Sequence, residues 1–315
     1  MDGGFGGFVE RVACPVCGAA GGRELYRCDY DEPPIRTYLV DFYRDRGHFD
    51  AQRVAGATFQ LVECSDCSLI YQAFVPDDEL LAEIYATFIT PEFEQRYVDS
   101  LFDDGMFARC TEEIWSLGKL CAKPFRDIRF LDYGMGFGHW ASVARAAGMQ
   151  SFGVELSECK VAAARTRGVI PIADDDLGPM QFDVIHTEQG FEHLPRPNET
   201  LGALVPALAP GGLLKISVPR TRGLKKAIAA ARFDGTDAQR DALNPVSPLE
   251  HLNAFCGNAI DRLAANHGLV PVSVPPALFW IEPSKRRFRN NVKATIYPFY
   301  RWLARSANNR TYRRA

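Results

Sequence analysis

From Ile128 onward, apolar runs short enough for buried strands alternate with amphipathic stretches of helical period. Strands are expected at 128–134, 151–156, 169–173, 182–187 and 213–219, and helices at 139–148, 158–168, 197–212 and 254–268. Such alternation predicts a mostly parallel sheet covered by helices on both faces. Two further apolar segments, 269–274 and 277–282, predict an antiparallel strand pair at its edge.

The first part of the chain has a different pattern. Residues 1–75 combine two C-x-x-C pairs with short β-prone pieces, and 76–88 has an apolar stripe at helical spacing. A second helical stretch runs from Glu92 to Cys121, with a break near Asp103. The expected domains are a zinc-binding domain (1–75), a helical connector (76–126), a ligand-binding α/β domain (127–282, with a lid or acceptor insertion at 220–247) and a basic aromatic tail (283–315).

The charge of the chain is distributed unevenly. Its 315 residues have a net charge of −3, yet 285–315 contain ten Lys or Arg and no acid. Residues 1–284 are therefore strongly acidic, which argues against a protein that binds nucleic acids in general. No stretch approaches the ~18 apolar residues of a membrane span. The start lacks the pattern of a secretory signal, so we expect a cytoplasmic protein with reduced cysteines.

The clearest ligand signal is the glycine loop FLDYGMGFG after the 128–134 strand. Its glycines, Gly134, Gly136 and Gly138, do not match the G-x-G-x-x-G pattern of dinucleotide sites. Asp132 would repel a pyrophosphate but attract an ammonium group. Glu155, 21 residues after Gly134, ends the next strand and suits the two hydroxyls of a ribose. These features favour S-adenosylmethionine over a nicotinamide dinucleotide.

Four segments in order resemble the class I S-adenosylmethionine-dependent methyltransferases: LDYGMGFG, GVELS, FDVIHTEQGFEHLPRP and LAPGGLLKISVP. The resemblance spans 125–282 and implies an α/β, Rossmann-like, seven-stranded methyltransferase sheet. The alternative is that the glycines only mark turns and Asp132 caps a helix. The implied cofactor-binding residues are Asp132, Tyr133, Gly134, Met135, Gly136, Gly138, Glu155, Leu156, Asp175, Thr187, Glu188 and Gln189.

The paired cysteines have the spacing of a structural metal site. Cys14 and Cys17 form one C-x-x-C turn and Cys64 and Cys67 another, and four thiolates complete a tetrahedral zinc site. Unligated buried cysteines or a redox pair are the alternatives. The pairing also resembles sugar C-methyltransferases, in which a small zinc domain precedes the methyltransferase fold. Those enzymes carry a further C-terminal domain that this chain does not hold.

Methyl transfer to a hydroxyl or carbon acid needs a general base. SPLEHLNAF resembles the active-site E-H segment of the sugar C-methyltransferases, which implies catalytic roles for Glu250 and His251, although Pro248 replaces the expected tyrosine. His193 in FEHLP is the third candidate. For each histidine the alternative is a hydrogen-bonded structural residue.

The expected function is methyl transfer to a small molecule, most simply a sugar on a nucleotide, lipid carrier or polysaccharide. An RNA methyltransferase and a non-catalytic scaffold are the alternatives. The tail combines arginines with Tyr297, Tyr300 and Trp302. This composition suits peripheral contact with an anionic membrane surface, docking on the acidic remainder of the chain, or binding to nucleic acid. The net charge of the chain disfavours nucleic acid. The acceptor atom (O, N or C), the pathway and the oligomeric state stay open.

Overall fold

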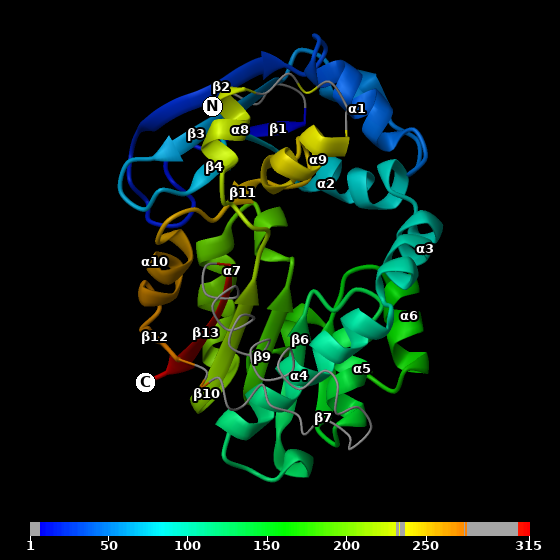
Figure 1. The fold of residues 1–315 in the computed structure, drawn as a ribbon, viewed down its shortest axis with the longest axis vertical. Helices are drawn as coiled ribbons and strands as arrows, with labels where there is room; N and C mark the ends of the chain where they lie inside the picture. Colours follow the sequence, from blue (N-terminus) through cyan, green and yellow to red (C-terminus); the bar gives the residue numbers. More distant parts are fainter. Residues whose placement is uncertain (1–6, 231–232, 234–236, 274, 276–307) are drawn as a thin grey trace, which may run out of the picture. The chain divides into compact units, whose positions relative to one another are not determined.

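The computed structural model describes residues 7–230, 233, 237–273, 275 and 308–315, and the chain divides into two compact units (Figure 1). The first, the cysteine unit, comprises Met1–Asp99, Phe191–Thr200 and Val218–Asn266. The second, the sheet unit, comprises Ser100–Gly190, Leu201–Ser217 and His267–Ala315. Because the chain passes between the units more than once, neither unit is one continuous stretch of sequence.

The sheet unit is built on a seven-stranded sheet of order β12-β13-β10-β9-β6-β7-β8 (Figure 1). Its parallel core consists of β6 (Arg129–Tyr133), β7 (Gln150–Val154), β8 (Ile170–Pro171), β9 (Phe182–Glu188) and β10 (Leu208–Ser217). The expected α/β class and mixed seven-stranded sheet are therefore confirmed. The chain order of the strands reverses beside β6, which is where open parallel sheets bind ligands.

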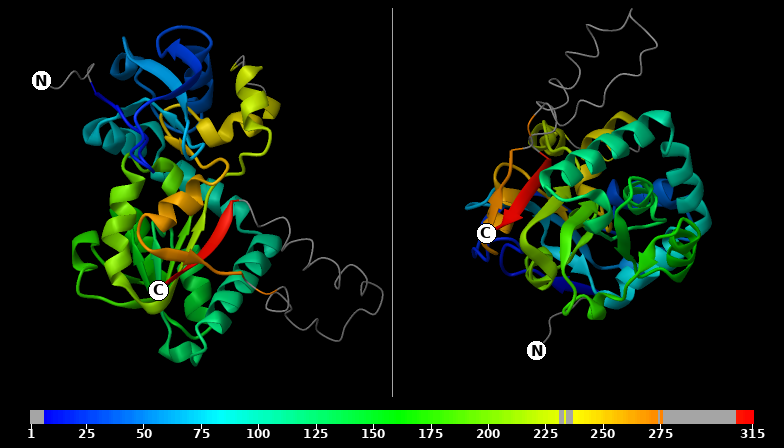
Figure 2. Two further views of the ribbon diagram at one scale, coloured as in Figure 1. Left: turned by 90° about the vertical axis from the view of Figure 1, so that its left-hand side faces the viewer. Right: turned by 90° about the horizontal axis from the view of Figure 1, so that it is seen from below.

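The antiparallel part of the sheet differs from the expected strand pair. β13 (Asn309–Arg314) lies between β10 and β12 (Leu269–Pro271) and is antiparallel to both (Figure 2). The end of the predicted basic tail is thus a strand of the sheet. The predicted strand 277–282 lies outside the described residues, as does most of the tail, including Tyr297, Tyr300 and Trp302.

Helices α4 (Asp104–Leu120) and α5 (His139–Ala146) pack together on the sheet. Ile114 of α4 and Val143 of α5 are buried with Phe130 of β6 and Val184 of β9. Asp103 accepts a hydrogen bond from the backbone N–H of Met106, which caps α4. That cap accounts for the break expected near Asp103, where α3 (Pro91–Leu101) has ended. The remaining helices are α6 (Glu158–Thr166) and α7 (Pro197–Leu204).

One predicted helix of this region is too long. The helix expected over 197–212 ends at Leu204, and a 3₁₀ turn, Val205–Ala207, leads directly into β10. Gly211 has a φ of +71°, and the pairing with β9 shifts register between Leu208 and Leu213. Gly211 and Gly212 therefore lie in the irregular first part of strand β10 and do not end a helix. The positive φ of Gly211 is a conformation that glycine adopts readily.

The cysteine unit contains a four-stranded antiparallel sheet of order β11-β4-β3-β2. Its strands are β2 (Gly22–Asp29), β3 (Thr58–Cys64), β4 (Ile70–Gln72) and β11 (Asn253–Ala254), while β1 (Phe8–Glu10) pairs with β5 (Phe74–Pro76). Its helices are α1 (Ile35–Tyr43), α2 (Asp78–Glu83) continued by a π turn (Ile84–Phe88), α3, α8 (Leu224–Ala229), α9 (Asp237–Leu243) and α10 (Ala259–Ala265).

The core of the cysteine unit is rich in aromatic residues. Tyr43 and Phe88 contact edge to face at 5.5 Å between ring centroids, and Phe59 contacts Phe233 in the same way at 5.8 Å. Phe233 belongs to the segment 220–247, expected as a lid, and Leu224 and Ile228 of that segment are buried with it. This segment contributes apolar side chains to the core of the unit, so burial accounts for its hydrophobic positions.

Among the described residues, none of the helices has the length and apolar character that crossing a bilayer would require.

Candidate functional site

The glycine loop connects β6 to α5 in a conformation that favours glycine. Gly134, Gly136 and Gly138 have φ angles of +72°, +51° and +78°, which side chains with a Cβ rarely adopt. The N–H groups of Gly134 and Met135 both donate to the carbonyl of Val154 at the end of β7. A Cβ on Gly138 would lie 2.7 Å from Cβ of Ala164, so α6 also packs closely against the loop. The bare backbone of this loop leaves room for a ligand.

Glu155 is fixed to the same loop. Its Oε2 accepts a hydrogen bond from the N–H of Gly136, and its Oε1 accepts bonds from Leu156 and Ser157, each at 3.0 Å. Three N–H donors hold the carboxylate in one orientation before any ligand arrives. The structure therefore brings the predicted acid and the predicted loop together.

Asp132 is buried at the end of β6, with 2% of its surface exposed. Its Oδ1 lies 2.9 Å from Nδ1 of His186, whereas Oδ2 has no hydrogen-bond partner among the described residues. Thr187 Oγ1, on β9, is likewise buried without a hydrogen-bond partner in the described chain. Buried polar atoms in native proteins normally have partners. A ligand that supplies an ammonium or hydroxyl group would satisfy these two oxygens, so the residues fit the expected cofactor.

The other predicted cofactor residues have varied surroundings. Leu156 is 90% exposed, and Asp175 is exposed in a 3₁₀ turn, Asp174–Asp176. Burial raises the pKa of Tyr133, and so does its contact with Asp174. Gln189, with a φ of +52°, donates its N–H to the carbonyl of Ser217.

Glu188, predicted as a cofactor residue, is held by two cations. Its Oε2 accepts from Nζ of Lys215 at 2.6 Å, and its Oε1 pairs with Arg109. Lys215 also pairs with Glu113 of α4. Sequence reasoning missed this buried network of Lys215, Glu113 and His186. The sequence feature that could have indicated the network is a lysine and a histidine in the middle of apolar strands, LLKISVP and FDVIHTE.

The four cysteines of the two C-x-x-C turns come together in the cysteine unit. Sγ of Cys14 lies 3.6 Å from Sγ of Cys67, and Sγ of Cys17 lies 3.5 Å from Sγ of Cys64. All four sulfur atoms are within 4.8 Å of one another. Sulfur atoms bound at ~2.3 Å around a tetrahedral metal are ~3.8 Å apart, so the set fits zinc closely.

The two cysteine turns have the same backbone form. The N–H of Gly18 donates to the carbonyl of Cys14, and the N–H of Ser68 donates to that of Cys64. Gly18 and Ser68 both have positive φ, +72° and +63°. The repeated geometry turns both thiols of each pair toward one point.

The three predicted catalytic residues lie close together in the cysteine unit. The ring centroids of His193 and His251 are 4.7 Å apart. His193 Nδ1 lies 3.0 Å from the carbonyl oxygen of Glu250, to which it donates. It also lies 2.9 Å from the hydroxyl of Tyr85, which sequence reasoning did not single out because the two residues are 108 positions apart. Glu192, fully buried, has a carboxylate oxygen within 4.8 Å of nitrogens of both histidines.

Burial sets the protonation states of Glu250 and His251. His251 Nδ1 donates to the carbonyl of Asn244, which leaves Nε2 as the lone-pair nitrogen of the neutral ring. Burial lowers the pKa of His251 to about 4, although the bond to Asn244 acts to raise it. Burial raises the pKa of Glu250 to about 7, against the influence of Arg46 and the Tyr43 hydroxyl. At neutral pH the pair thus offers a neutral imidazole and a carboxyl close to its titration midpoint.

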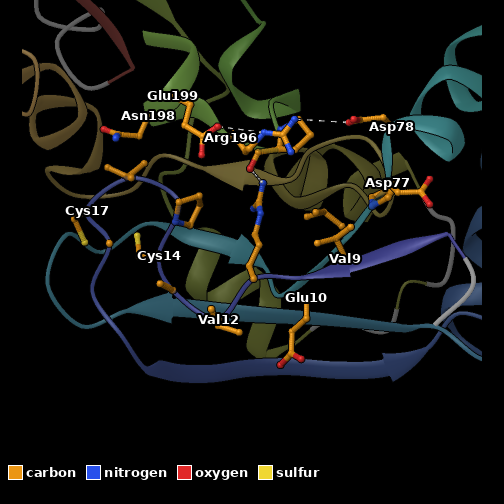
Figure 3. A pocket seen from close by; sticks show the side chains of 18 of the residues that line it. Val9, Glu10, Val12, Cys14, Cys17, Asp77, Asp78, Arg196, Asn198 and Glu199 are labelled. Atoms are coloured by element: carbon orange, nitrogen blue, oxygen red, sulfur yellow. Dashed lines mark hydrogen bonds and ion pairs between the residues drawn. The ribbon is translucent and has the colours of Figure 1, made fainter. Parts of the chain in front are cut away.

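A separate pocket of about 760 Å³ lies beside the first cysteine turn (Figure 3). Cys14 and Cys17 lie on one side of it, and Arg196 pairs with Asp78 at 3.9 Å and Glu199 at 3.4 Å. Within the described lining, none of the predicted catalytic or cofactor residues occurs. This pocket is therefore not part of the predicted chemistry.

Known proteins are similar to parts of this chain. A curated relative, ubiquinone biosynthesis O-methyltransferase of Caulobacter sp. (strain K31), is 32% identical over 121 residues, or 35% of this chain. The chain covers 47% of that protein, about half its length.

Similar solved structures include the plantazolicin methyltransferase BpumL in complex with a pentazolic desmethylPZN analog and SAH. It has 13% identity and a TM-score of 0.48, over 74% of this chain and 93% of that one. An S-adenosylmethionine-dependent methyltransferase from Mesorhizobium loti has 18% identity and a TM-score of 0.39, over 59% and 91%.

The match to a family model is the most extensive. Residues 103–274, more than half of the 315, match the family described as "Methyltransferase domain". The matched range includes the glycine loop, Glu155 and the central strands of the sheet. The chain therefore belongs to the methyltransferase-domain family, and its mixed seven-stranded α/β sheet matches the Rossmann-like methyltransferase fold.

Proposed function

We propose that the protein transfers a methyl group from S-adenosylmethionine to a small-molecule acceptor whose nucleophilic atom must lose a proton. The observation that carries the proposal is the pair of acids at the glycine loop. Asp132 offers a buried, unpartnered Oδ2, and Glu155 is held rigidly by the N–H of Gly136. This arrangement of negative charge favours a cationic nucleoside and disfavours a pyrophosphate.

Each acid has a distinct role toward the cofactor. Oδ2 of Asp132 accepts from the α-ammonium group, the strongest donor of the ligand. Glu155 accepts from a ribose hydroxyl with the lone pair of Oε2 that its three backbone donors leave available. The bound cofactor supplies an activated methyl group, and the protein has to align the acceptor and exclude water.

His251 is the proposed general base. Its Nδ1 is committed to the Asn244 carbonyl, so Nε2 takes the proton of the acceptor. Glu250, whose pKa burial raises to about 7, is the proposed acceptor of that proton from the imidazole. His193 anchors the backbone at Glu250 through its Nδ1 and is a positioning residue.

The proposed acceptor is a sugar carried by a nucleotide, a lipid or a polysaccharide. Two observations support it: the E-H segment similar to that of the sugar C-methyltransferases, and the convergence of Tyr85, His193 and His251. A phenolic hydroxyl, such as the related O-methyltransferase family suggests, is the competing acceptor. Both acceptors share the need for a base.

The four clustered cysteines are proposed to bind one structural zinc ion. Four thiolates fill a tetrahedral coordination sphere, so no position remains for substrate or water. The ion would connect the turn before β2 to the end of β3, where Gly22 and Cys64 are in register on neighbouring strands.

The experiment that tests the proposal is an acceptor screen with S-adenosylmethionine labelled in its methyl group. Nucleotide-linked sugars, lipid-linked sugars and simple phenols are incubated with the wild type and with His251→Ala. We expect label transfer to a sugar conjugate by the wild type and a loss of at least about 100-fold in His251→Ala. Transfer to phenols alone would reject the sugar acceptor, and equal activity of the variant would reject the base.

A further inference from the structure

Three polar residues form a row across the centre of the sheet. Asp132 of β6 is in register with His186 of β9, and His186 is in register with Lys215 of β10. Residues in register on neighbouring parallel strands direct their side chains to the same face of a sheet. The strand interior of an α/β sheet is normally apolar, so this row is unusual.

His186 joins the two ends of the row. It is fully buried, with Nδ1 2.9 Å from Oδ1 of Asp132 and Nε2 3.4 Å from Nζ of Lys215. Since a carboxylate oxygen only accepts, Nδ1 carries the hydrogen toward Asp132, while Nε2 lies between Lys215 and Oε1 of Glu113, 3.6 Å away. The Trp140 ring, 4.7 Å away between centroids, packs against the imidazole and limits its rotation.

Lys215 is itself fixed from the other side. Its ammonium group, 1% exposed, pairs with Glu113 and Glu188, and Arg109 pairs with Glu188. Arg109 and Lys215 balance Glu113 and Glu188. The Asp132 carboxylate is paired through Oδ1 with His186, while its Oδ2 has no partner in the described chain. Burial makes an unpartnered carboxylate oxygen costly. A cationic ligand group at Oδ2 would remove that cost.

We propose that His186 is a positioning residue for cofactor binding: its Nδ1–H fixes Oδ1 of Asp132, so that Oδ2 is presented to the α-ammonium group of S-adenosylmethionine. The inference rests on the proposed function for the identity of the ligand. Lys215 and Glu113 face the other ring nitrogen, and Glu113 and Glu188 hold Lys215. The network thereby connects α4 to the binding acid.

The test compares two ligands that differ in the group concerned. S-adenosylhomocysteine carries the α-ammonium group, while 5′-methylthioadenosine has the same nucleoside and thioether but no amino-acid end. Calorimetric titrations are made on the wild type, His186→Leu and His186→Asn. His186→Leu removes the donor to Asp132, and His186→Asn retains an N–H donor of similar reach to Nδ1.

We expect His186→Leu to weaken S-adenosylhomocysteine about tenfold or more, the usual effect of a lost charge-assisted hydrogen bond. Binding of 5′-methylthioadenosine should change less than about twofold, and His186→Asn should recover most of the lost affinity. A purely structural role would weaken both ligands alike. Ser151→Ala removes a buried hydrogen bond from β7 to the carbonyl of Ala141 on α5 and controls for loosening of the sheet.

Equal weakening of both ligands in His186→Leu, or unchanged binding of S-adenosylhomocysteine, would overturn this inference alone. A wild type that binds neither ligand would overturn the proposed function and this inference with it. If His186→Leu does not fold, His186→Met, close to histidine in volume, serves the same comparison. His186→Asn keeps the donor in either case.

Discussion

The N–H of Gly136 donates to the Glu155 carboxylate at 3.0 Å, which joins the middle of the glycine loop to the end of the neighbouring strand. The acid is thus both a ligand-binding group and a restraint on the loop that carries it. One substitution at this position therefore disturbs two parts of the cofactor site.

Glu155→Gln should weaken S-adenosylhomocysteine at least about tenfold. The amide has one acceptor oxygen where the carboxylate has two, and its NH₂ group would face the N–H groups of Leu156 and Ser157 or of Gly136. Calorimetric titration measures the change. Glu158→Gln, an exposed neighbour on α6, is the control and should bind like the wild type. Undiminished affinity in Glu155→Gln would contradict the role of Glu155.

His251→Ala should lower kcat by about 10²–10⁴ on the acceptor found in the screen, because a general base typically contributes that much. Its affinity for S-adenosylhomocysteine should stay within about twofold of the wild type. Steady-state kinetics and calorimetry measure the two effects separately. The exposed His48 gives the matched control, His48→Ala, which should retain full activity. A drop in cofactor affinity equal to the drop in kcat would argue for a structural role.

Glu250→Gln should stabilise the protein more at pH 8 than at pH 5. The pKa of Glu250 is about 7 in the folded chain and about 4.3 in the unfolded chain. Between these values the folded chain keeps a proton that the unfolded chain has lost, so stability falls as pH rises. Above pH 7 the full loss of about 4 kcal/mol is present.

Thermal melts of wild type and Glu250→Gln across pH 5–8 measure this effect. The difference in Tm should widen with pH, whereas Glu10→Gln, at an exposed position, should show no such trend. A pH-independent difference would mean that Glu250 is not protonated in the folded protein near neutral pH.

Cys64→Ser should lose the bound zinc. We expect elemental analysis to find about one zinc per chain in the wild type and much less in the variant, with a lower Tm, because the metal contributes directly to folding. Cys159→Ser, at an exposed cysteine of α6 outside the cluster, should keep its zinc. Zinc content that Cys64→Ser leaves unchanged would refute the site.

Some parts of the site were predictable because their signals are local. Gly134, Gly136 and Gly138 must adopt positive φ in a turn between strand and helix, and Glu155 ends the next strand of the same β-α-β unit. The two C-x-x-C turns are local as well, each closing within five residues. The positions of Asp132, Glu155 and the cysteines therefore followed from spacing alone.

Other parts depend on contacts between segments that are distant in the sequence. Tyr85 contacts His193 across 108 positions, and the segment 220–247, expected as a lid or acceptor insertion, buries Phe233 among aromatic rings of the first 90 residues. Amphipathicity shows that such a segment packs against something, but not against what. The same holds for β13, whose basic sequence does not reveal that it enters the sheet beside β10.

The sequence by itself determined the alternation of strands and helices, the acidic glycine loop and the cysteine turns, since each is encoded in residues that are neighbours along the chain. Only the tertiary structure decided that Asp132, His186 and Lys215 form one buried row, because the order β6-β9-β10 brings together strands 54 and 29 residues apart. Strand order results from the packing of the whole sheet, and a histidine or lysine has no partner until that packing is complete.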